Sequence, residues 1–284
     1  ITPATITAQA FHFSFDDVSR EYDATEKVGA AADTFVRNHY VLLSDGTKSD
    51  FNYSINSADY ISAGTTSAGT AVAAIKDVGT QKTVSYKIAV DPVSFANYNL
   101  DSSVSNVMTF NEAGAGTITP KAVYAKAVSD NLTKTYDGTE NLRTGNKTWS
   151  GDTATGTDLS GDSIIKLEGL ITGDGAKNVS TGSYDNADVG KGNKTVNYSV
   201  AIDNAHAGNY VIYADGDQTK TVLTKLTTAT NTINPYGLAL SFGKVERTYD
   251  GTTAIDHKLV TPTLSTKTVN GDTVSLDTGY TANY

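Results

Sequence analysis

The sequence predicts an all-β protein made of tandem, elongated β-sandwich domains of Ig-like character. Three observations carry this prediction: a composition that favours strands and turns, a period-two alternation of apolar side chains, and a long internal repeat. Tyr occurs 16 times and Gly 25 times, whereas Met and Trp occur once each. Tyr, Thr and Val favour half-buried pleated surfaces, and Gly, Asn and Asp favour the turns between them. A chain of 284 residues exceeds what one core usually organises, so we expect two or three domains.

The internal repeat is visible at two kinds of short segment. The tripeptide Ile-Thr-Pro at residues 1–3 returns at 118–120 and, as Ile-Asn-Pro, at 233–235. A segment with a basic residue, then Tyr-Asp two residues later, and Thr at its end occurs at residues 20–25, 134–139 and 247–252. Each of these segments also has Val or Leu four residues before its tyrosine. Because both segments recur in the same order and at similar spacing, the chain contains nearly two and a half copies of one unit.

Apolar side chains alternate strictly in the stretch before the tyrosine of the first and third copies. The alternating positions are Phe11, Phe13, Phe15 and Leu238, Leu240, Phe242. Successive side chains of a strand point to opposite faces, so this pattern predicts a strand that buries one face.

A second repeated block gives the clearest strands of the chain. Asp-Val-Gly at residues 77–79 and 188–190 is followed in each copy by Lys-Thr-Val and then by an alternating run that leads to Asn-Tyr at 97–98 or 209–210. The apolar positions of these runs are Val84, Tyr86, Ile88, Val90 and Val196, Tyr198, Val200, Ile202. One-sided alternation is typical of an antiparallel sheet with one wet face.

The repeat places the domain boundaries. We expect residues 1–3 to be the tail of a preceding repeat, residues 4–119 the first copy, residues 120–234 the second copy, and residues 235–284 the truncated start of a third. The copies meet at Thr-Pro and Asn-Pro, where proline restrains its own φ and the residue before it. The joints are short and are not rich in Ser or Gly, so we expect neighbouring domains to bend little against one another.

A β-grasp-like α+β fold is the alternative to the sandwich. It requires a small helix, and residues 28–36 are the nearest candidate in the first copy, although the segment is short and Ala-rich. The sequence leaves the order of the strands open.

The repeated segments resemble the YDG repeat of large bacterial filamentous-haemagglutinin-like surface adhesins. The matching residues of the second copy are 118–120, 134–139, 187–196 and 207–210, and the first and third copies match more loosely. The resemblance implies a bacterial, extracellular, repeated stalk or adhesive module without enzymatic chemistry, and it implies no particular ligand. Ala24 departs from the pattern, because Gly stands at the equivalent positions 138 and 251.

The Tyr-Asp-Gly-Thr segment is the repeated motif that most resembles a functional site. As a structural turn, its tyrosine would close a strand and send its ring into the core, its aspartate would cap the turn, and its glycine would take a left-handed conformation. As a binding site, an exposed tyrosine would stack its ring on a sugar, and the aspartate would accept hydrogen bonds from the sugar hydroxyl groups. We favour the structural turn. The motif residues are Tyr22, Asp23, Tyr136, Asp137, Gly138, Thr139, Tyr249, Asp250, Gly251 and Thr252.

The composition argues against several classes of function. The net charge is −9, which disfavours nucleic acid and anionic membrane surfaces, and no apolar stretch is long enough to insert into a membrane. Cysteine is absent, and the four histidines, His12, His39, His206 and His257, do not recur in register. Acidic turns such as residues 215–217, 270–272 and 158–162 could bind Ca²⁺ but lack the spaced ladder of a dedicated site. We expect no catalytic, cofactor or metal site, and no enzyme.

These observations lead to one expected function and one alternative. The chain is expected to be a non-enzymatic stalk or adhesive region of a bacterial adhesin, at the cell surface or secreted, whose partners are neighbouring repeats of the same chain. The alternative is a module that binds a host-surface glycan or protein through a site lined by Tyr, Asn and Asp. An intramolecular Lys–Asn isopeptide bond is a further possibility for which the sequence nominates no pair.

Overall fold

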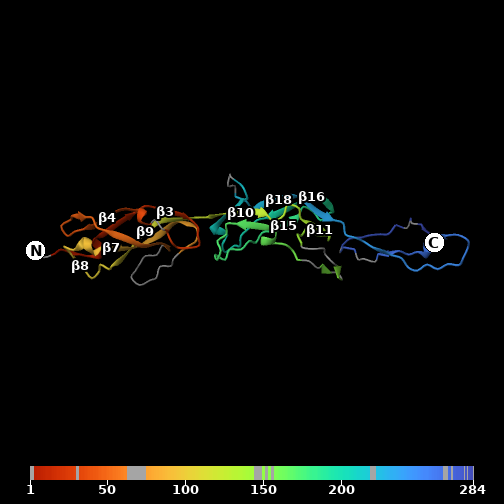
Figure 1. Ribbon diagram of the computed structural model, residues 1–284, viewed down its shortest axis with the longest axis horizontal. Coiled ribbons are helices and arrows are strands. Elements are labelled where there is room, and N and C mark those ends of the chain that lie inside the picture. The colour runs from red at the N-terminus through yellow and green to blue at the C-terminus, as the bar shows by residue number, and fades with distance from the viewer. Residues whose placement is uncertain are drawn as a thin grey trace. The chain divides into compact units, whose positions relative to one another are not determined.

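The computed structural model confirms that the protein is all-β (Figure 1). It describes residues 3–29, 32–62, 75–143, 149–150, 153–154, 157–217, 222–264, 268–269, 271–277, 279 and 281–283. Within these ranges the regular elements are strands and short 3-10 helices, and no α-helix is present. None of the helices in the described part of the chain is long and apolar enough to cross a membrane.

The chain forms two compact units that are described separately below. Unit 1 comprises Ile1–Val123, Gly169–Ala176 and Asp203–Ile212, and unit 2 comprises Tyr124–Glu168, Lys177–Ile202 and Tyr213–Tyr284. Unit 1 therefore contains the first copy together with two loops of the second. The repeat boundaries expected from the sequence stay a prediction, since compactness groups these loops with the copy that they contact.

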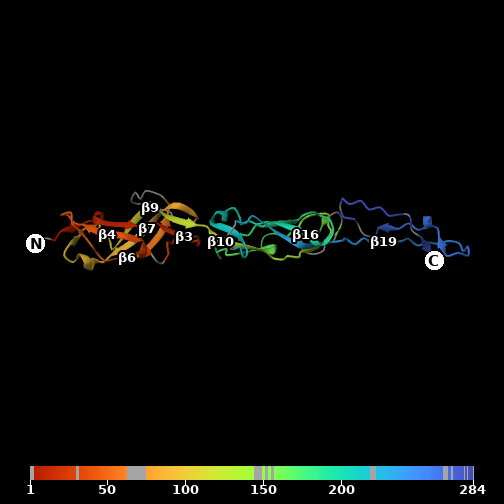
Figure 2. The ribbon, with the colours of Figure 1, turned by 90° about the horizontal axis from the view of Figure 1, so that it is seen from above.

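The first copy is built from a four-stranded sheet and a three-stranded sheet, which are visible in Figures 1 and 2. The four-stranded sheet has the order β3-β9-β7-β6, and its strands are β3 Val18–Glu21, β9 Val107–Thr119, β7 Gly79–Val90 and β6 Tyr53–Ile61. The other sheet has the order β2-β4-β5, with β2 Phe11–Phe15, β4 Val36–Leu42 and β5 Lys48–Ser49. β1 Thr5–Ile6 pairs with β8 Asn99–Leu100. All pairs in the two larger sheets are antiparallel except β3 with β9, which is parallel.

The core of the first copy lies between these strands. The alternating residues of β7 are buried as predicted, with Val84, Tyr86 and Ile88 fully inaccessible. Phe15 of β2 stacks on Tyr86 with a centroid distance of 3.8 Å, so side chains of the two sheets meet. A second cluster joins Ile6, Phe11, Val41, Phe51, Val90, Phe95 and Met108. Burial of such aromatic and aliphatic area is the main favourable contribution to folding.

The second copy repeats the same four-stranded order. Its sheet is β11-β18-β16-β15, with β11 Thr133–Thr135, β18 Lys225–Asn234, β16 Gly190–Ser199 and β15 Thr181–Tyr184. β11 pairs with β18 in parallel, as β3 pairs with β9. A three-stranded sheet has the order β14-β10-β17, with β14 Ile165–Glu168, β10 Lys121–Ala127 and β17 Tyr210–Ala214; β12 Trp149–Ser150 pairs with β13 Thr153–Ala154. The predicted apolar positions Val196, Tyr198, Val200 and Ile202 are buried, although β16 ends at Ser199.

The third copy differs from the prediction. Its alternating residues are 41% (Leu238), 49% (Leu240) and 60% (Phe242) exposed, and only β19 Leu240–Ser241 forms there. The sequence of this copy contains no counterpart of the Asp-Val-Gly block, whose strand covers this face in the first copy. Its other described strands are β20 Ala254–Ile255, β21 Thr263–Leu264 and β22 Ala282–Asn283.

The candidate helix of the β-grasp alternative is not an α-helix in its described part. Within residues 28–36, whose positions 30 and 31 lie outside the described residues, the chain forms the 3-10 helix η2 Ala32–Phe35 and then enters β4. The other 3-10 helices are η1 Ala8–Ala10, η3 Pro92–Phe95, η4 Gly161–Ser163, η5 Ala207–Asn209 and η6 His257–Leu259. Thr34 and Phe35 favour extended backbone, and the Ala-rich turn before them is too short to propagate a helix.

Two equivalent core tyrosines provide a matched test of buried polar groups. The Tyr86 hydroxyl is buried and has no hydrogen-bond partner among the described residues, whereas the Tyr198 hydroxyl lies 3.5 Å from Thr228 Oγ1. We expect Tyr86→Phe to stabilise the chain by up to about 1 kcal/mol, because it removes an unsatisfied buried group. We expect Tyr198→Phe to destabilise it by about 0.5–1 kcal/mol. Urea unfolding of both variants measures the difference, and equal effects would contradict the assignment.

Candidate functional site

The Tyr-Asp segment folds into the same turn in all three copies, with Ala24 in place of glycine in the first. The Oδ1 atom of the aspartate accepts hydrogen bonds from the backbone N–H and the Oγ1 hydroxyl of the threonine two residues later. These distances are 2.9 and 2.8 Å for Asp23–Thr25, 2.9 and 2.8 Å for Asp137–Thr139, and 3.0 and 2.9 Å for Asp250–Thr252. An aspartate that caps its own turn in this way replaces a backbone hydrogen bond.

The residue between the aspartate and the threonine is left-handed in all three copies. Gly138 has φ +70° and Gly251 has φ +78°, and Ala24 adopts φ +65° at the equivalent position. The turn therefore keeps one form in the first copy, and Ala24 carries the cost of a Cβ in the left-handed region.

The basic residue two positions before the tyrosine closes the turn, a role that sequence reasoning missed. Its side chain pairs with the aspartate three residues later, at 2.5 Å for Arg20–Asp23, 2.9 Å for Lys134–Asp137 and 2.8 Å for Arg247–Asp250. It also donates to the backbone carbonyl of the turn threonine in each copy. The signal was present in the sequence, because every copy has opposite charges at this spacing.

The turn of the second copy is the most buried of the three. The side chains of Lys134 and Asp137 are each 2% exposed, whereas those of Asp23 and Asp250 are more than half exposed. Burial raises the pKa of Asp137, but hydrogen bonds from Lys134 and Thr139 outweigh burial, and the pKa lies below its usual value. The ion pair is thus a satisfied buried pair, whose loss of one partner would be costly.

The tyrosine of the first copy makes a contact that its own copy does not supply. The Tyr22 hydroxyl donates to Asp174 Oδ1 at 2.7 Å, and Tyr210 donates to Oδ2 of the same carboxylate at 2.7 Å. Lys76 Nζ lies 3.2 Å from Asp174 Oδ1, and the Asp174 side chain is fully buried. The rings of Tyr22 and Tyr210 meet edge to face with centroids 5.5 Å apart. We call these four residues the Asp174 cluster.

The protonation states of the Asp174 cluster follow from burial and hydrogen bonding. Burial raises the pKa of Asp174, but the donors Tyr22, Tyr210 and Lys76 more than compensate and hold it below its usual value. Burial and then the neighbouring Asp174 carboxylate raise the pKa of Tyr22, and the same causes raise the pKa of Tyr210 to about 12. The cluster is therefore a carboxylate held by two phenols and an ammonium group at neutral pH.

A second polar contact lies beside the cluster in unit 1. Asn209 Nδ2 donates to Asp77 Oδ1 at 2.8 Å, and Asn209 Oδ1 accepts from the Val78 backbone N–H at 2.9 Å. Asn209 is 6% exposed. The Asp-Val-Gly block of the first copy thus contacts the Asn-Tyr block of the second. Sequence reasoning identified both repeated blocks but missed their contact, and it missed Asp174 and Lys76, which belong to no repeated motif.

The three motif tyrosines differ in burial, which corrects the expectation that their rings enter the core of their own copy. Tyr22 is 1% exposed because the second copy's loops cover it. Tyr136 is partly buried and donates to Asp272 Oδ1 at 3.2 Å, whereas Tyr249 is 90% exposed. The backbone places the first two alike, since the N–H of Tyr22 donates to Thr119 O and that of Tyr136 to Asn234 O, both at 2.8 Å.

An open polar depression of about 550 Å³ lies over β4 and β5 of the first copy. Tyr40, Asn38, Asp50 and Tyr53 are among its lining residues. The Tyr40 ring has two close neighbours: His12 stacks on it with centroids 4.8 Å apart, and Lys48 Nζ lies 4.2 Å from its centroid. The depression resembles the Tyr/Asn/Asp-lined site of the alternative function, but its best stacking platform is occupied.

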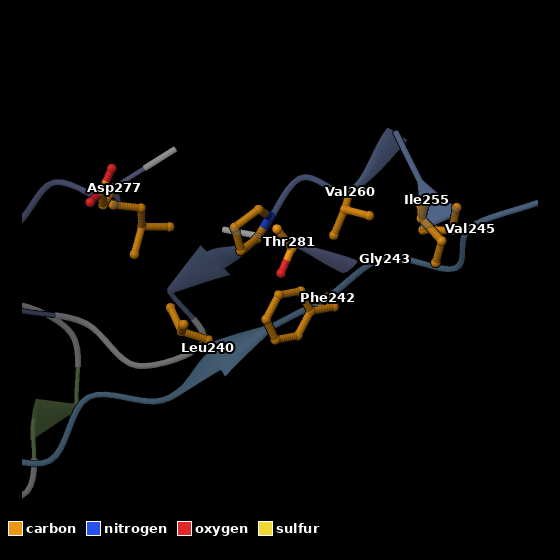
Figure 3. A pocket seen from close by; sticks show the side chains of 10 residues that line it. Leu240, Phe242, Gly243, Val245, Ile255, Val260, Asp277 and Thr281 are labelled. Carbon is orange, nitrogen blue, oxygen red and sulfur yellow. The ribbon is translucent and has the colours of Figure 1, made fainter. Parts of the chain in front are cut away.

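An apolar hollow of about 660 Å³ lies in the third copy (Figure 3). Figure 3 shows the side chains of Leu240, Phe242 and Val260 around it. Leu240 and Phe242 are positions that the alternating pattern assigned to a core, and both are about half exposed, so this part of the hollow is an exposed apolar face.

The described residues do not assemble a metal centre. No group of three or more His, Cys, Asp or Glu side chains is placed to hold an ion within the described ranges. His39 pairs with Asp50 at 2.7 Å and His206 with Asp203 at 2.7 Å, which raises the pKa of His206. In the acidic turns, Asp158 pairs with Arg143, Asp162 accepts from Asn178, and Gly216 takes φ +75°; Asn270 lies outside the described residues.

Substitutions at the left-handed position of the turn are predicted to change the free energy of unfolding in opposite directions in the first and second copies. We expect Ala24→Gly to stabilise the chain by up to about 1 kcal/mol, since it removes the Cβ from a left-handed residue. We expect Gly138→Ala to destabilise it by about 1 kcal/mol for the same reason. Urea unfolding measures both, and stabilisation by Gly138→Ala would show that the turn has another conformation.

The hydroxyl of Tyr22 gives a second prediction. Tyr22→Phe removes a donor from a buried carboxylate, so we expect a loss of about 1.5–3 kcal/mol in the free energy of unfolding. Tyr249→Phe is the matched control, because this tyrosine of the same motif is 90% exposed, and we expect a change within about 0.5 kcal/mol. Equal effects of the two substitutions on the free energy of unfolding would show that the Tyr22 hydroxyl does not stabilise the fold.

The lowered pKa of Asp174 gives a third prediction, on acid stability. The pKa of an aspartate in an unfolded chain is about 3.9. A carboxyl whose pKa is lower in the folded chain stabilises the fold at pH values above about 3.9, and this stabilisation is lost as the pH falls through the pKa of the folded state. Asp174→Asn should therefore reduce the loss of stability between neutral pH and about pH 3. Urea midpoints of both proteins across this range test it, and parallel curves would contradict it.

The comparison with known families agrees with the repeat in the second copy. Residues 119–222 match the family model described as YDG domain. No curated protein and no solved structure gave a match. The chain thus carries a YDG domain over most of its second copy, which is the stretch that places the Lys134–Asp137 turn and Asp174.

Proposed function

We propose that this chain is a non-enzymatic repeat segment, a stalk or adhesive region, of a bacterial adhesin located at the cell surface or secreted. The Asp174 cluster is the observation that carries the proposal. It ties loops of the second copy to the first through a buried carboxylate with three donors. A structural protein needs such fixed contacts between successive units, and the YDG domain in the second copy and the resemblance of the other copies support the adhesin class.

The physical case for a stalk rests on what separation of the two copies would cost. Separating the copies would remove the Tyr22 phenol and the Lys76 side chain from Asp174, while Tyr210 of the same copy stays bonded to it. A buried hydrogen bond to a charged group contributes about 1.5–3 kcal/mol. The Asn209 contacts add a hydrogen bond to a backbone N–H and one to a carboxylate. The connecting Thr119-Pro120 segment is short and restrained. Together these features favour a joint that resists bending.

We also propose that each complete copy is an Ig-like β-sandwich formed by its four-stranded and three-stranded sheets. The Phe15–Tyr86 stack between β2 and β7 supports face-to-face packing in the first copy. A parallel pair that joins the first and last strands of a sheet is compatible with a sandwich whose other pairs are antiparallel. An experimental structure with the two sheets side by side would contradict this proposal.

The surroundings of the protein follow from the same proposal. We place it outside the bacterial cell, with neighbouring repeats of the same chain as its immediate partners. The net charge of −9 disfavours nucleic acid, and we propose no direct membrane insertion by this segment and no enzymatic activity.

Small-angle X-ray scattering of the 284-residue chain tests the stalk. A stalk requires an extended particle with a narrow range of distances between its copies. We expect Asp174→Ala to broaden that range, while Asp215→Ala, at a turn outside the cluster, leaves it unchanged. A compact scattering profile of the unsubstituted chain would overturn the proposal.

A second candidate function, glycan binding, is favoured by the depression over β4 and β5. It offers Asn38 and Asp50 for hydrogen bonds to hydroxyl groups and the Tyr53 ring as an apolar surface. A glycan array probed with the whole chain tests it, with Asp50→Ala as the variant that should lose binding. Absence of any bound glycan, or binding that survives Asp50→Ala, would remove this site from consideration.

A further inference from the structure

The Asn-Tyr dipeptide occurs twice, and its two occurrences have different surroundings. In the second copy, Asn209 and Tyr210 are each 6% exposed and contact the first copy's Asp77, Val78 and Tyr22. In the first copy, Asn97 is exposed and Tyr98 is half-buried. The same two side-chain types are therefore covered in one copy and accessible in the other.

The exposed dipeptide lies at a definite end of the first copy. Figure 1 shows β8, which follows Tyr98 directly, near the chain's N-terminus, while β3, which leads to Tyr22, lies at the other end of this copy; the second view agrees for β3 (Figure 2). Tyr98 and Leu43 pack against the same apolar cluster. Leu43 begins the turn that carries the exposed carboxylate of Asp45. This end therefore presents an amide, a phenol and a carboxylate close to one cluster.

These groups match those that the second copy offers to the first. In the observed contact, the second copy supplies the Asn209 amide, the Asp174 carboxylate from a turn after β14, and the Tyr210 ring, which meets Tyr22 edge to face. The Tyr210 hydroxyl itself donates to Asp174 of the same copy. The first copy supplies the Tyr22 hydroxyl, the Asp77 carboxylate and the Val78 N–H. Asn97 and Tyr98 correspond to Asn209 and Tyr210 by position along the repeat. Asp45 offers a carboxylate from the turn after β4, as Asp174 does from a turn after β14.

We infer that the Asn97–Tyr98 end of the first copy is a docking surface for another repeat of this kind, which presents its Tyr-Asp-Gly and Asp-Val-Gly blocks. The Asn97 amide would bind the carboxylate and the backbone N–H of the Asp-Val pair, as Asn209 does. The Asp45 turn would accept the hydroxyl of the incoming motif tyrosine. The two copies meet through Ile118-Thr119-Pro120, and the same tripeptide, Ile1-Thr2-Pro3, stands before the first copy. The occupant is therefore a repeat joined to the first copy through that tripeptide. The covalent connection gives this repeat a high effective concentration at the docking surface.

The test adds a repeat in front of the chain. Residues 1–117 are fused before Ile1, which recreates the natural spacing, and the added copy carries Tyr98→Phe so that the Tyr98 peptide reports only on the original copy. Hydroxyl-radical footprinting with mass spectrometry then measures side-chain oxidation. Tyr210, buried in the observed contact, and Tyr249, 90% exposed, are the internal references.

We expect the oxidation rate of Tyr98 in the fusion to fall several-fold from its value in the plain chain, toward that of Tyr210. The protection should disappear when the added copy carries Tyr22→Phe and Asp77→Ala. An unchanged rate for Tyr98, with Tyr210 still protected, would overturn the inference, as would protection that survives the double substitution.

Folding of the added copy is verified in the same experiment. Tyr86 is fully buried, so low total oxidation of its peptide shows that both first-type copies are folded. If the added copy does not fold, residues 118–232 are fused instead, because this segment offers Tyr136, Asp188 and Val189 at the equivalent positions. The added segment then carries Tyr210→Phe, so that the Tyr210 peptide reports only on the original copy. The same outcomes for Tyr98 then decide the inference. Loss of docking would leave the adhesin proposal intact, because that proposal rests on the contact already observed.

Discussion

Parallel pairing between an early strand and the last strand of the four-stranded sheet is the constraint on which the other features depend. In the first copy this pair is β3 with β9, and in the second it is β11 with β18. Two parallel strands run in the same direction, so their C-terminal ends lie at the same end of the sheet. The tyrosine that follows the early strand therefore lies where the chain leaves the copy. The N–H of Tyr22 consequently bonds to Thr119, the residue before the connecting proline. The Tyr-Asp-Gly turn is thereby held beside the connection to the next copy.

The buried Asp174 carboxylate beside this connection contributes more to the specificity of the contact between the copies than to its strength. Desolvation of Asp174 is costly, and two phenols and an ammonium group offset the cost only when they all reach it together. A small rotation of one copy would remove the Tyr22 and Lys76 contacts and leave the charge with Tyr210 alone of the three donors. An apolar contact of similar area would tolerate such a rotation, because apolar attraction has no preferred direction. The cluster therefore favours one relative orientation of the groups that it joins within unit 1.

The sequence predicted the local features well and the contacts between distant segments poorly. Alternation identified the buried face of β7 because each side chain of a strand faces the core or solvent by parity. The capped turn was predictable because Asp23 and Thr25 are two residues apart and need no other partner. Asp174 was not predictable, since its role depends on Tyr22 and Lys76, which are distant in sequence and do not share a repeated pattern with it. The exposed Phe242 was mispredicted because alternation indicates which face seeks burial but does not supply the strand that covers it.

The third copy separates the two roles of the motif. Its turn is complete, with Asp250 bonded to Thr252 and paired with Arg247, although the strands that surround the turn in the other copies are largely absent among its described residues. These bonds, which close the turn, thus join residues of its own six-residue segment. Tyr249, by contrast, is 90% exposed, while Tyr22 is 1% exposed under the loops of the following copy. Burial of the motif tyrosine is therefore not a property of the repeat that contains it. It reports contact with another repeat, and the aspartate, the basic residue and the left-handed position hold the tyrosine ready for that contact.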